Sequence, residues 1–160
     1  KSETTKTFFA TVQNKLHFSI TGKTAAEIIS TRANAQKENM WLTSWKFSPN
    51  WPIRKSDVSI AKNYLQEKEL DSLNRIVSMY LDYAEDQAKR KIPMTMEDWE
   101  KKLNAFLQFN EREILSWSWK VTQEIAKAFA ESEFEKYRVI QDRVYKSDFD
   151  KLLEDQAKLG

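Results

Sequence analysis

The sequence predicts an all-α protein: a single compact bundle of about six helices, with a long irregular loop near residues 34–55 and a long C-terminal helix. Two observations support this class. The 160 residues include only two glycines and three prolines, so tight turns are few. Apolar residues also recur every three or four positions along most of the chain. Because this length suits one domain, we expect residues 1–160 to form a single helical domain.

The first half of the chain predicts two helices before the irregular loop. The first helix should end at Gly22, since glycine readily adopts the left-handed conformation that stops a helix. The second should begin after Thr24, which forms a capping box with Glu27. The apolar face of the first helix consists of Phe8, Phe9, Val12, Leu16 and Ile20.

The second half predicts longer helices. We expect helix to return at Ser56, and an amphipathic helix to run from residue 67 until Pro93 ends it. Thr95 and Asp98 should cap the next helix. The last helix should start near residue 122 and reach about residue 158. Its apolar face drifts around the axis, so its far end either projects or packs elsewhere.

Composition excludes several classes of function. The 26 basic and 24 acidic residues give a net charge of +2, which argues against nucleic-acid binding by this fragment alone. The absence of cysteine excludes disulfides, thiolate nucleophiles and cysteine metal sites, and it fits a reducing compartment. No apolar run reaches 18 residues, so we expect no membrane span. The N-terminus does not resemble a signal peptide, and a start at lysine suggests a fragment.

The candidates for catalysis are weak. His17 is the only histidine, and the sequence marks no partners for a triad. The segment "TGKT" lacks the first glycine of a phosphate-binding loop, so a turn followed by a helix cap explains it. We therefore expect no enzymatic activity, no cofactor and no metal. The acidic pairs lie among lysines and arginines, as on solvated helix surfaces: Glu67 and Asp71, Glu97 and Asp98, Glu111 and Glu113, and Asp148 and Asp150.

The aromatic residues are the strongest functional signal. They concentrate in two segments without helical spacing, "MWLTSWKFSPNWP" at residues 40–52 and "SWSWK" at residues 116–120. Trp45 and Trp99 are expected in the core. The remaining rings either form an exposed protein-binding hot spot or pack their own loops, and composition leaves both interpretations open. The candidate anchors are Trp41, Phe47, Trp51, Trp117 and Trp119, and the candidate polar rim is Lys46, Asn50 and Lys120.

Several long segments, among them "VQNKLHFSITGKTAAEII", "IRKSDVSIAKNYL" and "LNRIVSMYLDYAEDQAKRKIPMTMEDWEKKLNAFLQFNEREIL", resemble the C-terminal region of the RhuM virulence-protein family of bacteria. The resemblance covers nearly the whole chain. Family members are longer, with an N-terminal region like a DNA-binding regulatory module. The resemblance implies a cytoplasmic bacterial protein whose helical C-terminal part mediates contacts, and it transfers no catalytic residues.

The chain departs from the family pattern at the aromatic positions. The family has glycine where this chain has Trp41, Phe47, Trp51 and Trp119, and a small polar residue in place of Trp117. We hypothesise that large aromatics were placed on these loops, making the chain a designed binder on a RhuM-like scaffold whose partner is another protein or a second copy. The alternative is a natural interaction or regulatory domain of a RhuM protein whose DNA-binding half is absent.

Overall fold

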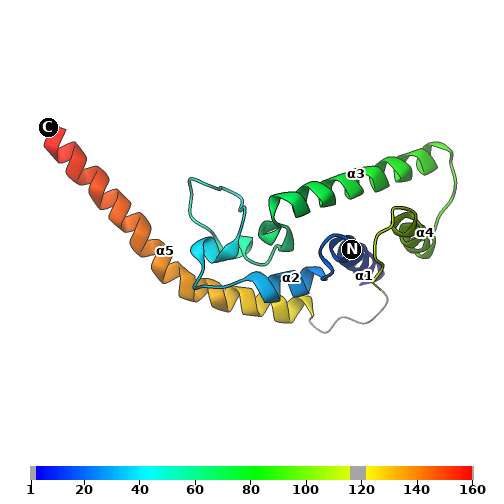
Figure 1. The fold of residues 1–160 in the computed structure, drawn as a ribbon, viewed down its shortest axis with the longest axis horizontal. Helices are drawn as coiled ribbons and strands as arrows, with labels where there is room; N and C mark the ends of the chain where they lie inside the picture. The colour runs from blue at the N-terminus through cyan, green and yellow to red at the C-terminus, as the bar shows by residue number, and fades with distance from the viewer. Residues whose placement is uncertain (1–2, 116–121, 160) are drawn as a thin grey trace.

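A computed structural model describes residues 3–115 and 122–159, and this part of the chain is all-helical, as predicted. It contains five α-helices and three short 3₁₀ helices (Figure 1). The α-helices are α1 (Glu3–Thr21), α2 (Ala25–Arg32), α3 (Glu67–Lys89), α4 (Met96–Phe109) and α5 (Gln123–Leu159). The 3₁₀ helices are η1 (Glu38–Trp41), η2 (Lys55–Asp57) and η3 (Ala61–Tyr64).

The predicted caps are confirmed where polar side chains open helices. Thr24 caps α2, because its Oγ1 accepts a hydrogen bond of 3.2 Å from the backbone N–H of Glu27. Thr95 and Asp98 form a reciprocal capping box at α4, with distances of 3.1 and 3.0 Å. Gly22, with φ +73°, follows the last residue of α1. The segment "TGKT" is thus a helix stop followed by a helix cap.

The helix expected to return at Ser56 is present, but it is not a continuous α-helix. This segment instead forms the two short 3₁₀ helices η2 and η3. Polar side chains of this segment bind backbone groups that a regular helix would not offer them. The Asp57 carboxylate accepts from the backbone N–H groups of Lys46 and Arg54, and the Asn63 side-chain amide donates to the Asp57 carbonyl. Such bonds compete with the regular helical ladder.

The helices pack in two groups around one core. α2 lies along the first half of α5, while α1 packs against α3 and α4 (Figure 1). The second half of α5 projects away from the body (Figure 1). Of the two arrangements that its drifting apolar face allowed, the helix thus adopts the projecting one. None of the described helices is long and apolar enough to cross a membrane. The most deeply buried core side chains include Ile28, Ile29, Met40, Val58, Tyr64, Leu65, Leu103 and Leu107.

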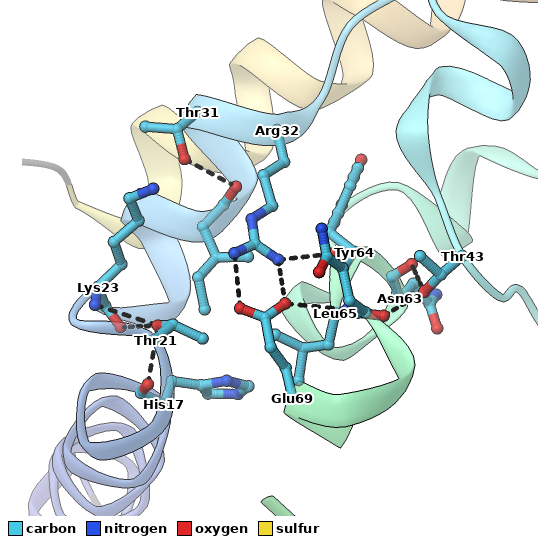
Figure 2. A network of polar contacts seen from close by, with 12 residues as sticks. His17, Thr21, Lys23, Thr31, Arg32, Thr43, Asn63, Tyr64, Leu65 and Glu69 are labelled. Carbon is cyan, nitrogen blue, oxygen red and sulfur yellow. Dashed lines mark hydrogen bonds and ion pairs between the residues drawn. The ribbon is translucent and has the colours of Figure 1, made fainter. Parts of the chain in front are cut away.

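An ion pair ties α2 to α3 (Figure 2). The Arg32 guanidinium binds both carboxylate oxygens of Glu69, at 2.6 and 2.9 Å, and also donates to the carbonyl of Tyr64 at 2.9 Å. The hydrogen bond from Arg32, more than any other contact, lowers the pKa of the Glu69 carboxyl below its ordinary value. Because this planar guanidinium on α2 binds groups from two other segments, it fixes α2 against the end of η3 and the start of α3.

Candidate protein-binding surface

Two of the predicted anchors lie together. Phe47 is 42% exposed and Trp51 is 68% exposed, on the loop between η1 and η2. Together with Pro52 and Arg54 they line a depression of about 390 Å³. Lys46 and Asn50 of the predicted rim are also exposed. We call the exposed surface formed by Phe47, Trp51, Pro52 and Arg54 the aromatic loop surface.

The other predicted anchors are placed differently. Trp41 is 52% exposed, but it lines a separate depression of about 430 Å³ beside Arg32, Thr43 and Tyr64. Trp45 is only 9% exposed and belongs to the core, as expected. The second aromatic segment, with Trp117, Trp119 and Lys120, lies outside the described residues.

The backbone of this loop is held by the tryptophan beneath it. The indole Nε1 of Trp45 donates a hydrogen bond of 2.7 Å to the carbonyl of Trp51. The Trp51 N–H in turn donates to the carbonyl of Phe47 at 3.1 Å. Because the Trp45 ring is buried, these bonds fix the turn that presents Phe47 and Trp51 to solvent.

A buried carboxylate closes the base of the loop. Asp57 is 2% exposed. One of its oxygens accepts from the Lys46 N–H at 3.2 Å, and the other accepts from the Arg54 N–H at 2.8 Å. The two carboxylate oxygens therefore join Lys46, where the loop begins, to Arg54, where it ends. They satisfy two backbone N–H groups that have no partner in a sheet or helix.

A glutamine from α5 anchors the exit of the loop. Gln141 is 6% exposed, and its amide pairs with the backbone of Ile53 in both directions. The Ile53 N–H donates to Gln141 Oε1 at 2.8 Å, and Gln141 Nε2 donates to the Ile53 carbonyl at 3.0 Å. This is the hydrogen-bonding pattern of a neighbouring strand, supplied here by one side chain from 88 residues away.

Cationic groups border the aromatic loop surface. Lys46 Nζ lies 5.3 Å from the centroid of the Phe47 ring, and the Arg54 guanidinium carbon lies 5.4 Å from it. Both distances are within the range of a cation–π contact. The surface therefore combines an apolar centre with a positively charged edge.

Trp41 ends a left-handed turn. Asn39, Met40 and Trp41 have φ values of +54°, +55° and +67°. Asparagine tolerates this region, and Met40, which is fully buried, anchors the turn in the core. For tryptophan the left-handed conformation is strained, whereas glycine adopts it freely. The backbone at position 41 thus has the conformation that a glycine favours.

Replacing Trp41 with glycine is expected to raise the free energy of unfolding by up to about 1 kcal/mol, because it relieves the left-handed strain at a half-exposed site. That gain corresponds to a rise in melting temperature of roughly 3 °C for a chain of this size. Trp41→Ala is the matched control, since it removes the ring but keeps a Cβ at positive φ. Equal melting temperatures for the two variants would show that strain is not the cause.

The carboxylate pairs considered for catalysis lie at the surface. Glu97 pairs with Lys101 one turn away at 3.4 Å, and Asp98 caps α4. Within residues 3–115 and 122–159, no group of three or more histidine or acidic side chains is arranged to hold a metal ion. His17 is 3% exposed, so its side chain is buried and does not lie at the surface.

Comparison with known proteins identifies the family of this chain. No curated protein and no solved structure matches it. The model of the virulence protein RhuM family matches residues 1–146, which include the whole of the aromatic loop surface. The match spans every described helix except the far end of α5. The chain therefore belongs to the virulence protein RhuM family.

Proposed function

We propose that this chain is a non-enzymatic protein-binding module of a bacterial, cytoplasmic, virulence-associated protein, and that it binds a partner protein through the aromatic loop surface. One observation carries the proposal: Phe47 and Trp51 are exposed side by side around one depression, on a backbone fixed by buried polar groups. In this proposal Trp41, Trp117 and Trp119 are further anchors, and Lys46, Asn50 and Lys120 contribute to a polar rim.

The fixed backbone favours binding. Association normally costs free energy because loops and side chains become ordered at the interface. Here Asp57, Gln141 and Trp45 already hold the loop, and aromatic side chains have only two torsions to lose. Exposed tryptophans of this kind are the residues that most often dominate binding energy at protein interfaces.

The chemistry of the surface indicates the kind of partner. The Phe47 and Trp51 rings would bury best against an apolar side chain that enters the depression between them. The positive charges of Lys46 and Arg54 favour carboxylates around that side chain. We therefore expect a partner segment with a large apolar residue flanked by aspartate or glutamate.

A phage-displayed library of random peptides tests this proposal without a known partner. Peptides enriched on the wild-type chain should contain an apolar anchor with acidic neighbours. A variant carrying Phe47→Ala and Trp51→Gly should bind them at least about 100-fold more weakly, since two hot-spot side chains are lost. Its melting temperature should equal or exceed that of the wild type, because neither side chain belongs to the buried core.

The matched control is Phe109→Ala, which removes an aromatic ring that is 88% exposed on α4. This variant should bind the selected peptides as the wild type does. If the double variant also keeps its affinity, the aromatic loop surface is not the binding site. If the double variant fails to fold, the rings serve to pack their own loop.

A second candidate function is that of a natural interaction or regulatory domain of the RhuM family. It would work beside a DNA-binding half of the kind that the sequence resemblance implies. It differs from the first proposal in the partner and in the role of the aromatic rings, and from the designed binder hypothesised from the sequence in the origin of those rings. For a family protein that carries such a DNA-binding half, this candidate predicts DNA association that weakens steeply with salt concentration. It also predicts no enriched peptide that depends on Phe47 and Trp51.

A further inference from the structure

The far half of α5 has an apolar face that the described chain leaves uncovered. Gln141 is the last buried residue of α5, and every described side chain after it is exposed. This part of the helix projects from the body (Figure 1). Its exposed apolar side chains are Val144, Tyr145, Phe149, Leu152, Leu153 and Leu159.

These side chains have the spacing of a two-helix interface. Tyr145, Leu152 and Leu159 are seven residues apart, and Phe149 and Gln156 fall between them on the same face. A helix turns by about 100° per residue, so these five positions span a stripe less than a third of its circumference wide. The stripe therefore suits another helix lying along it.

The charges beside this stripe are self-complementary. Asp148, Lys151, Asp155 and Lys158 follow one edge of it with alternating sign, and in the part of the chain that the structure describes they make no ion pairs. When two identical helices pack antiparallel, this charged edge of one helix lies beside the same edge of the other, with the residue order reversed. Asp148 then lies near Lys158 of the second copy, and Lys151 lies near Asp155.

A parallel pair would lack these contacts. In parallel packing this charged edge would meet the opposite edge of the second helix, where Leu153 lies. The charge order thus favours the antiparallel arrangement. An amphipathic helix also gains most of its stability from packing its apolar face, so a projecting segment of this kind is stabilised by a partner.

We propose that the chain self-associates through the far half of α5, which pairs antiparallel with the same segment of a second copy. The four apolar side chains of the stripe, together with Val144 and Leu153 on either side of it, give about 500 Å² per copy if each buries on the order of 80 Å². The total of about 1,000 Å² is at the lower limit for a specific interface, which predicts a weak, reversible dimer. This surface is distinct from the aromatic loop surface.

Sedimentation equilibrium of the full chain tests the proposal. The wild type should follow a monomer–dimer equilibrium between about 1 and 500 μM, and Leu152→Asp should weaken dimerisation at least about 30-fold. Leu152 is 55% exposed, so this variant should keep the helical circular dichroism of the monomer. A wild type that stays monomeric throughout, or a Leu152→Asp variant that dimerises equally well, would overturn the proposal.

Charge reversal tests the antiparallel order. The variant Asp148→Lys/Asp155→Lys has a wholly positive edge, and Lys151→Asp/Lys158→Asp has a wholly negative one. Each should be monomeric alone, whereas an equimolar mixture should form a heterodimer. Asp150→Lys/Glu154→Lys is the control, because it makes the same charge change on the opposite face and should leave dimerisation intact. If the mixture does not associate, or if the control dissociates, antiparallel pairing along this edge is ruled out.

Discussion

Replacing Asp57 with alanine is expected to lower the free energy of unfolding by about 3 kcal/mol, because it leaves two backbone N–H groups without their charged acceptor. Asp57 is 2% exposed, so water cannot easily replace the lost carboxylate. For a chain of this size the loss corresponds to a fall in melting temperature of roughly 10 °C. Chemical denaturation followed by circular dichroism measures it.

Two further variants separate the causes. Asp57→Asn keeps one acceptor oxygen, so it should lose about half as much stability as Asp57→Ala. Ser56→Ala changes an exposed neighbour and should stay within about 0.5 kcal/mol of the wild type. A loss below about 1 kcal/mol for Asp57→Ala would contradict the role assigned to this carboxylate.

Asp57 also links stability to the proposed function. Its bonds join the two ends of the loop that carries Phe47 and Trp51. Without them the loop would be less ordered, and binding would then require more ordering at the interface. Under conditions in which the Asp57→Asn variant is still folded, its affinity for selected peptides should therefore fall although no contact residue has changed.

The helices could be predicted because their signals are local. Thr24 and Glu27 lie three residues apart, as do Thr95 and Asp98, and each pair satisfies backbone groups at its own helix start. The end of α1 follows equally from the single glycine at position 22. Short-range patterns of this kind depend little on the rest of the fold.

The support that Gln141 gives to the loop could not be predicted, because it acts over a long distance in sequence. Gln141 is an ordinary polar residue in a helical pattern, and nothing near it indicates that its amide will pair with Ile53. The only available signal was its position on the buried stripe of α5, in register with Phe134 and Tyr137. A polar residue on such a stripe indicates a buried acceptor or donor, without naming its partner.

The shortage of glycine also concealed the turns. Glycine normally marks backbone positions with positive φ. In the described chain, five other residues adopt that conformation: Asn39, Met40, Trp41, Lys91 and Glu111. The left-handed turn before the aromatic loop therefore had no signal in the sequence except Asn39.

Acidification is expected to destabilise the protein through His17. This side chain is 3% exposed, and burial lowers its pKa from 6.5 to about 4. Its Nδ1 has no hydrogen-bond partner among the described residues, so nothing there stabilises the protonated, charged form of the ring in the folded protein. The unfolded chain binds that proton more readily below pH 6.5, and protons therefore favour unfolding.

The pKa of His17 in the unfolded and the folded chain determines the direction of this effect and the pH range in which it occurs. The stabilising contribution of neutral His17 is complete above pH 6.5, is lost as the pH falls, and is gone near pH 4. The whole loss amounts to about 3 kcal/mol. Urea denaturation at a series of pH values should show this slope in the wild type but not in His17→Gln, which carries no titrating ring.

Glu69 provides the internal reference for this experiment. Its pKa is lowered chiefly by the hydrogen bond from Arg32, so its stabilising contribution is lost only below the ordinary carboxyl value of 4.5, beneath most of the His17 window. His17→Gln should therefore remain constant from pH 6.5 to about 5 and still lose stability at lower pH. If His17→Gln instead retained the wild-type slope between pH 6.5 and 5, the acid sensitivity would have to arise from another group, because the Arg32–Glu69 pair does not titrate there.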